Sequence, residues 1–514
     1  MPLPAEGSPW PPPRMQPTYD AMREADVWYT GNKKEIAEFY GRAVQRDRDR
    51  PSLQDRLWAQ PRDLSQPERR IHVPIAGDIA TASADLLFSE APTVRHDDAT
   101  TQARLDVLAE DGAAHMRYVE SAELGAALGD SYLTAVWDRD VVPDRPILTS
   151  WAGDMAIPTI RYGRLVEVTF WREVERTGDT VLRLLERHAV ETGAGLIEYG
   201  IYEGTSANLG RRIPLTAHED AAHLDPVTDD QGRQPTDIPY LTATHIPNAR
   251  PNRDHRGYLG RSDYGTGVYD LFDGADQTMT SWLRDIRLGQ GRAAVTAGAL
   301  QDLGEGKGAF FDVHQEIYDE LAMPPGSEHG ITVIQFQIRH EEHRATFDHI
   351  LSSIARSCGY SPSTFGLAED GGGRTATEVV DRKSRSNTSS GRKGLYWKPS
   401  LRRISQAWIA LDAVHFNGGG NPTVAPTVEL APPERQSAES IARSLQMLRS
   451  AEVISDYLSV KMQHPEWRDT EVNEEVARLE QMRTTDADPW MDASTGLAGN
   501  QLDGAPPEDD PSDE

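Results

Sequence analysis

The sequence predicts an α+β fold, with helices and antiparallel strands in the first half and mainly helices in the second. Between residues 132 and 202, apolar and polar residues alternate in short runs, and Gly163, Gly178 and Gly195 supply turns between them. This pattern is typical of an antiparallel meander. From 262 to 288 the apolar residues instead recur every three or four positions, which indicates one amphipathic helix.

Composition narrows the classes of protein to which the chain can belong. Its 514 residues are enough for about three domains of ~150 residues. With 53 Lys and Arg against 81 Asp and Glu, the formal net charge is −28, which argues against a surface that wraps nucleic acid tightly. Cys358 is the single cysteine, so no intramolecular disulfide can form, and its place on an apolar stripe predicts a buried small hydrophobe rather than a nucleophile. No run approaches the ~18 apolar residues of a membrane span.

The first half divides into an arm and a mixed region. Residues 1–18 carry seven prolines and predict an extended, poorly ordered arm. Within residues 19–261, the apolar period predicts helices at 19–41 (interrupted near Gly31), 75–90, 101–110 and 113–128. Strands are expected at 132–137, 146–151, 155–161, 165–174, 180–189, 195–202 and 240–246, and a loop at 218–234.

The second half is organised by two helices that flank an insertion. The first is expected at 262–288 and would be roughly 40 Å long. Residues 289–340 hold glycines and short apolar patches, with a strand at 331–338, and predict a small α/β unit. The second helix is expected at 341–358, with Phe347, Ile350 and Ile354 on one face.

The remaining segments are a glycine loop, a basic helix, a cap and a tail. Residues 359–375 contain Asp370, Gly371, Gly372, Gly373 and Arg374, a stretch with unusual backbone freedom. Residues 376–433 predict a polar, basic helix and a linker, and 434–483 a set of small helices. Residues 484–514 hold nine acidic residues and no Lys or Arg, which predicts a disordered acidic tail.

Catalytic motifs are weak throughout. His340-Glu341-Glu342-His343 places two histidines three residues apart, whereas a zinc-protease helix needs them four apart with the glutamate after the first. A metal-dependent hydrolase using His340 and His343 stays open as one alternative, with solvated histidines as the simpler interpretation. No cofactor motif is present, and the absence of a coherent site favours a protein that is not an enzyme.

A basic run follows the glycine loop and inverts the sign of the chain's charge. Residues 374–403 hold nine Lys and Arg against Glu378 and Asp381. One interpretation is a solvated helix face or salt bridges between subunits; the other is contact with the phosphates of a passing nucleic acid. The candidate phosphate contacts are Arg382, Lys383, Arg385, Arg392 and Lys393.

The order of these parts resembles the portal proteins of tailed double-stranded-DNA phages, most closely the siphophage type. The resemblance covers residues 20–483. It is carried by residues 72–80 and 84–92, by Ser262-Asp263 before the first long helix, by residues 375–378 after the glycines and by residues 452–455. It implies a wing (19–261), stem helices (262–288 and 341–358), a clip (289–340), a tunnel loop (359–375), a wing-to-crown helix and linker (376–433) and a crown (434–483).

The resemblance also implies a function and partners. Portal proteins form a ring, usually of twelve copies, at one capsid vertex, and DNA is packaged and ejected through the channel of that ring. Expected partners are further copies of the chain, double-stranded DNA, the terminase large subunit, the head-to-tail adaptor, and the major capsid and scaffolding proteins. The expected location is the virion, and the host cytoplasm during assembly. Stem packing is expected from Leu271, Phe272, Met279, Trp282, Ile286, Phe347, Ile350 and Ile354. A non-ring acidic scaffold or adaptor protein stays open as a further alternative.

Overall fold

The computed structural model shows two compact units, Met1–Pro433 and Glu434–Glu514, each of which is described by itself. The described residues are 2–46, 56–60, 70–110, 113–253, 257–265, 267–289, 292–294, 301–302, 309–310, 332–334, 338–367, 376–431, 438–451, 453–464, 467 and 469–485. The glycine loop 370–374 and the tail beyond 485 lie outside them, so the expectations made for those segments stay predictions.

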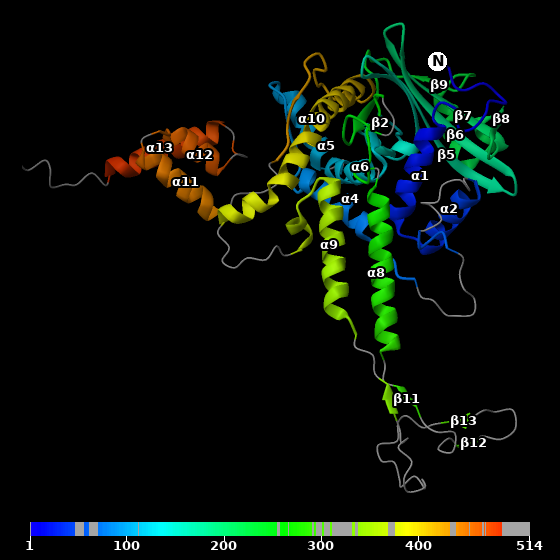
Figure 1. Ribbon diagram of the computed structural model, residues 1–514. Coiled ribbons are helices and arrows are strands. Elements are labelled where there is room, and N and C mark those ends of the chain that lie inside the picture. Colours follow the sequence, from blue (N-terminus) through cyan, green and yellow to red (C-terminus); the bar gives the residue numbers. More distant parts are fainter. Residues whose placement is uncertain are drawn as a thin grey trace, which may run out of the picture. The chain divides into compact units, whose positions relative to one another are not determined.

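Part of the expected meander is present in the first unit as a six-stranded sheet (Figure 1). The strands expected at 132–137 and 146–151 belong to a separate sheet instead. Five strands run antiparallel in the order β4-β5-β6-β7-β8, and β9 pairs with β7. Their bounds are β4 Ala156–Arg161, β5 Arg164–Thr177, β6 Thr180–Glu191, β7 Ala194–Thr205, β8 Asn208–Ile213 and β9 Arg233–Pro235. Strands β8 and β9 were not expected, and the 218–234 segment expected to be a loop holds β9 and the short helix α7, Glu219–Ala222.

A second sheet lies against the helices. It has the order β10-β2-β3, with β10 Ala243–Pro247, β2 Asp130–Val136 and β3 Ile147–Ala152. The helices are α1 Gln16–Thr30, α2 Lys33–Arg46, α4 Ile75–Phe88, α5 Ala99–Glu110 and α6 Ala114–Leu128, which confirms the expected positions. Small residues let α4 and α6 pack closely, because Ala76, Ala80, Ala122 and Ala126 are all nearly fully buried.

The N-terminal arm packs against the six-stranded sheet. Leu3, Trp10 and Met15 are buried, and Trp10 packs edge-on against Trp171 with ring centroids 5.2 Å apart. Backbone hydrogen bonds run from Gly7 N to Gly210 O (2.7 Å) and from Trp10 N to Ala207 O (2.9 Å). The expectation of a poorly ordered arm was therefore wrong, because three apolar anchors outweigh a proline-rich composition that lacks any helical or strand period.

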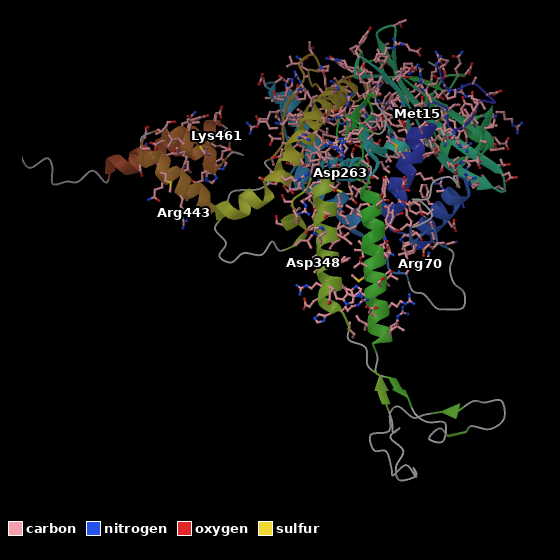
Figure 2. The ribbon with its side chains drawn as sticks, in the orientation of Figure 1. Met15, Arg70, Asp263, Asp348, Arg443 and Lys461 are labelled. Atoms are coloured by element: carbon pink, nitrogen blue, oxygen red, sulfur yellow. The ribbon has the colours of Figure 1, made fainter. Side chains whose placement is uncertain are left out.

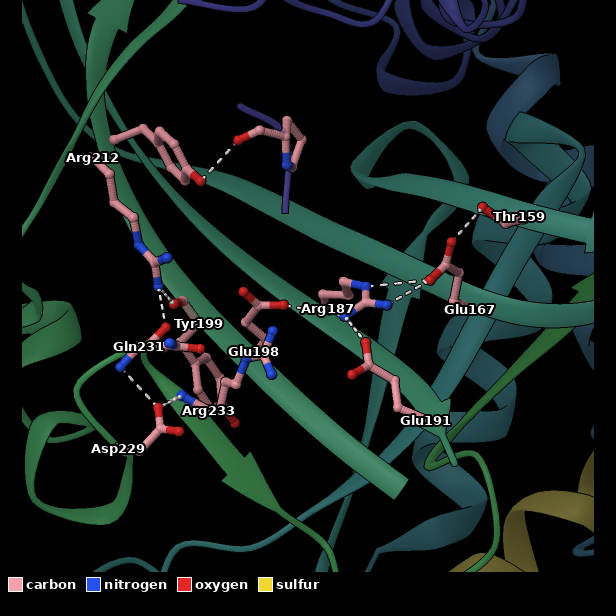
Figure 3. Close-up of polar contacts among 12 residues, drawn as sticks. Thr159, Glu167, Arg187, Glu191, Glu198, Tyr199, Arg212, Asp229, Gln231 and Arg233 are labelled. Carbon is pink, nitrogen blue, oxygen red and sulfur yellow. Dashed lines mark hydrogen bonds and ion pairs between the residues drawn. The ribbon is translucent and has the colours of Figure 1, made fainter. Parts of the chain in front are cut away.

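The large six-stranded sheet also holds a buried charge cluster on β6. Arg187 contacts Glu167 at 2.7 Å, Glu191 at 2.9 Å and Glu198 at 3.1 Å (Figure 3). The three glutamates come from β5, β6 and β7, so the single guanidinium ties three neighbouring strands together. We interpret this cluster as structural, because burial of Arg187 requires carboxylate partners around it.

Two antiparallel helices extend side by side from the layer formed by the helices of the first unit (Figure 1). They are α8, Val268–Leu288, and α9, His340–Cys358. The first begins at Val268 and not at Ser262, because Gly267 adopts a left-handed φ of 92° and the residues before it are fixed by other contacts. Between the helices, β11 Arg292–Ala294 pairs with β14 Thr332–Ile334, and β12 Gln301–Asp302 with β13 Ala309–Phe310.

The expected basic helix is α10, Ala376–His415, a single helix of 40 residues that contains Pro399. Its second half buries Trp397, Leu401, Ile404 and Trp408 against α4, β2 and β10. After it, β15 Thr427–Glu429 pairs with β1 Thr93–Arg95. The second half of α10 is therefore a core element of the first unit.

The second unit contains three helices, as expected for residues 434–483. They are α11 Ala438–Ser450, α12 Asp456–Gln463 and α13 Asp469–Thr485. The side chain of Ser455 caps α12 by accepting a hydrogen bond from Leu458 N. Helix α13 continues to Thr485, so the first two residues of the expected tail are helical.

Candidate functional site

The α8–α9 hairpin is held by the apolar residues that its period indicated. Phe272 and Ile354 are buried in one cluster, and Leu271, Phe347 and Ile350 pack against that cluster. Further along, the Trp282 ring stacks on His343 with an interplanar angle of 7°. Met279 is half-buried. Towards the end of α8, Leu283, Ile286 and Leu288 are about 40 % exposed. Leu283 and Ile286 share one helix face, so the hairpin leaves apolar side chains open there.

Next to this apolar stripe, α8 carries a row of acceptors that sequence reasoning missed. The Asp273 carboxylate accepts a hydrogen bond from Leu57 N (3.0 Å), and Thr280 Oγ1 accepts one from Ile71 N (2.9 Å). Between them, Asp276 accepts from Trp58 Nε1 (2.9 Å) and Val73 N (2.7 Å), and contacts His72 Nδ1 at 2.8 Å. Burial raises the pKa of Asp273. The signal was present in the sequence, because the acidic residues lie three apart on one helix face.

A buried ion pair joins α10 to the segment before α8. Lys393 Nζ lies 2.6 Å from Asp263 Oδ2, 2.6 Å from Ser83 Oγ and 2.9 Å from Tyr360 Oη. Asp263 also accepts hydrogen bonds from Tyr360 Oη and Asn248 Nδ2. Figure 2 shows Asp263 near the ends of α8 and α9 that meet the helical layer. Burial lowers the pKa of Lys393, and Asp263 opposes that shift. The interpretation of Lys393 as a phosphate contact is therefore wrong, because its ammonium group is enclosed and paired.

Next to this pair lies a cavity of about 670 Å³ lined by arginines. Arg385 and Arg392 come from α10, Arg356 from the end of α9, and Arg253 and Arg261 from the segment before α8. Five hydroxyl side chains complete much of the lining: Ser353, Ser357, Ser384, Thr388 and Ser389. Asp263 is the one carboxylate in the lining, and Lys393 already neutralises it. We call this cavity the arginine pocket.

The guanidinium groups of the arginine pocket lack carboxylate partners in the described part of the chain. Arg385 donates to the Arg356 carbonyl oxygen (2.7 Å), and Arg356 donates to Ser353 Oγ (3.3 Å). The buried Nε of Arg261 has no hydrogen-bond partner among the described residues. Five clustered arginines that pair with no carboxylate among the described residues form a site suited to binding an anion.

Sequence reasoning found only part of this site. It singled out Arg385 and Arg392, which the structure brings together in the pocket. It missed Arg253, Arg261 and Arg356, which lie far away in sequence and carry no local signal. The side chains of Arg382 and Lys383 lie outside the described residues.

The histidines considered for a metal site have ordinary roles. His343 Nε2 lies 2.9 Å from Asp285 Oδ2, and Arg339 binds the same carboxylate oxygen at 2.9 Å. Together the His343 and Arg339 contacts lower the pKa of Asp285. The His340 side chain is 65 % exposed beside Glu341. Within the described ranges, no group of three or more His, Cys, Asp or Glu is arranged to hold a metal ion.

Two further features of the described residues bear on function. Cys358 is buried, and this burial raises the pKa of its thiol, as suits a packing residue rather than a nucleophile. None of the helices that the structure describes is long and apolar enough to cross a membrane.

Comparison with known proteins adds a weak likeness to solved structures. No protein-family model and no curated protein matches the chain significantly. One solved structure that resembles it is described as "Neck of empty GTA particle computed with C6 symmetry". The alignment covers 76 % of this chain and 90 % of that one, at 15 % identity and a TM-score of 0.36.

Proposed function

We propose that this chain is a portal-type subunit that assembles into a ring at one vertex of a phage-like capsid. The α8–α9 hairpin carries the proposal. It leaves the helical layer as two antiparallel helices, bears a small pair of strands between them and exposes Leu283, Ile286 and Leu288 on one helix. Exposed apolar side chains on a pair of packed helices are expected to contact another protein, and a neighbouring copy would turn such hairpins into the wall of a channel.

The roles of the other segments follow from the same proposal. The 19–261 region would form the wing, residues 289–340 the clip, residues 359–375 the tunnel loop and 434–483 the crown. The clip would contact the terminase large subunit during packaging and the head-to-tail adaptor afterwards, and the capsid and scaffolding proteins would contact the outside of the ring. The chain itself would not be an enzyme and would need no cofactor, since ATP hydrolysis would belong to the terminase. Its location would be the virion, after assembly in the host cytoplasm.

The charge of the chain suits the passage of DNA. Each copy brings a formal net charge of −28, so a ring would repel a duplex and keep it from binding tightly. Weak phosphate contacts would come from Arg374 in the loop and from Arg382 and Lys383 after it. Asp370 and the three glycines that follow it would let the loop adjust to the passing helix.

Assembly is the decisive measurement. Native mass spectrometry and negative-stain electron microscopy of the purified chain should show closed rings, with twelve copies as the expected number. A chain that stays monomeric at all concentrations would contradict the proposal. Replacing Gly371, Gly372 and Gly373 together by alanine should impair DNA packaging while rings still form; loss of the rings would instead show that the loop is structural.

A further inference from the structure

Among the described residues, no carboxylate pairs with the five arginines of the arginine pocket. Arg385 and Arg392 are exposed at its edge. Arginine forks bind planar carboxylates through two parallel hydrogen bonds. A second copy of an acidic chain is therefore one natural supplier.

The same subunit also has a surface with carboxylates that lack a basic partner among the described residues. On α4, Asp78, Thr81 and Asp85 are exposed, and their spacing of three and four residues places them on one helix face. Glu123 of α6 lies beside them, accepting hydrogen bonds from Thr81 Oγ1 (3.4 Å) and Tyr29 Oη (2.8 Å). In the described part of the chain, no Lys or Arg forms an ion pair with Asp78, Asp85 or Glu123. We call these three carboxylates the acidic ridge.

The ridge and the pocket face away from each other across α4. Ser83 is the α4 residue that contacts the pocket side, because its Oγ accepts from Lys393 Nζ at 2.6 Å. Each helical residue advances by about 100° around the axis, so Ser83 points roughly 160° away from the middle of the ridge. One copy therefore cannot pair its own ridge with its own pocket, whereas two copies side by side can.

We propose that the arginine pocket of one copy receives the carboxylates of the acidic ridge of a second copy. This is a head-to-tail contact between two different surfaces, and contacts of this type generate rings when the rotation closes. The inference deepens the proposed function and rests on it for the closure of the ring. Arg385 and Arg392 are accordingly assigned to the contact between copies rather than to DNA.

A DNA phosphate is the competing ligand for this pocket. Arginine and hydroxyl side chains would suit it as well. The second copy is favoured because the chain carries a matching set of carboxylates on the opposite side of one helix, and no Lys or Arg among the described residues forms an ion pair with them.

Charge reversal on each surface tests the pairing. In Arg356→Glu/Arg385→Glu/Arg392→Glu three glutamates outnumber the two remaining arginines of the pocket, so both surfaces are acidic, and in Asp78→Lys/Asp85→Lys both are basic. Like charges then meet at every contact, so each variant alone should need roughly a hundredfold higher concentration for half assembly. An equimolar mixture should assemble again, because each acidic pocket then meets a basic ridge and each basic pocket an acidic ridge. Mass spectrometry of the mixture should show the two variants in equal numbers.

Lys398→Glu/Arg402→Glu is the matched control, since both residues are exposed on α10 and lie outside the pocket. It should assemble like the unchanged chain, and circular dichroism should show that all variants are folded. Three results would overturn the inference: normal assembly of either variant, failure of the mixture to assemble, or normal assembly of the pocket variant with lost DNA retention, which would assign the pocket to phosphate. A monomeric unchanged chain would overturn both this inference and the proposed function, whereas charge reversal without effect would overturn this inference alone.

Discussion

Lys393 and Asp263 form a buried ion pair, with 2.6 Å between Nζ and Oδ2, that joins the middle of α10 to the segment leading into α8. Tyr360, Asn248 and Ser83 complete its hydrogen bonds. The pair belongs to the scaffold beneath the arginine pocket, so its loss should first be felt in stability.

Replacing Lys393 by Met should lower the free energy of unfolding by about 3 kcal/mol, since it leaves a buried carboxylate without its counterion. Urea unfolding followed by circular dichroism measures this. The double variant Lys393→Met/Asp263→Asn should lose less than the sum of the two single variants, because it removes both charges. The exposed Lys398→Met is the control, with a change within about 0.5 kcal/mol; an equal loss in that control would contradict the assignment.

Asp276 anchors α8 to the segment around His72. Asp276→Ala would leave Trp58 Nε1 and Val73 N without their acceptor, so the free energy of unfolding should fall by about 2–4 kcal/mol. Gln277→Ala, one position along on the exposed side of the helix, should change it by less than about 0.5 kcal/mol. Thermal unfolding of the two variants compares them directly, and similar melting temperatures would show that the anchor contributes little.

The end of α8 should matter for assembly more than for folding. Ile286 is 41 % exposed, so Ile286→Ser should change the unfolding free energy of one subunit by less than about 1 kcal/mol. If copies pack on this surface, the variant should yield fewer rings by native mass spectrometry. Ser281→Ala, also exposed on α8, serves as control; unaffected ring yield in Ile286→Ser would remove this surface from the contact.

Asp285 predicts a specific pH dependence. His343 and Arg339 lower its pKa in the folded chain below the ordinary value of 3.8. A carboxyl group with a lowered pKa stabilises the fold above its unfolded pKa, and this contribution is lost as the pH falls through the folded pKa. Asp285→Asn should therefore be less stable than the unchanged chain at pH 6, and the difference should shrink below about pH 4. A difference that is constant with pH would contradict this.

The helices were predictable wherever an apolar period ran without interruption, as it does around Phe272 in α8 and Ile354 in α9. Contacts between distant segments were not. The proline count of the N-terminal arm concealed Leu3 and Trp10, which are buried because the sheet lies beside them, with Trp171 of β5 against Trp10 and β7 next to Leu3. Lys393 was predicted to lie on the surface because it is charged. Its burial next to Asp263 depends on tertiary packing, which the local sequence does not reveal.

The arginine pocket also combines residues that the sequence could not show to be neighbours. Arg385 and Arg392 stood out because their neighbours in sequence are also basic. Arg253, Arg261 and Arg356 each lie in an ordinary local context, and only the fold brings them to one cavity. The sequence showed that α10 is unusually basic. The structure was needed to show which arginines from other segments lie in the same cavity.

The contacts of Asp276 couple the position of α8 to the beginning of α4. Val73, whose backbone N–H binds Asp276, lies two residues before the start of α4 at Ile75. A tilt of α8 would therefore pull on the beginning of the helix that carries Asp78 and Asp85. In the proposed ring, a partner that binds the far end of the hairpin would therefore strain or relax the contact between the acidic ridge of one copy and the arginine pocket of the next.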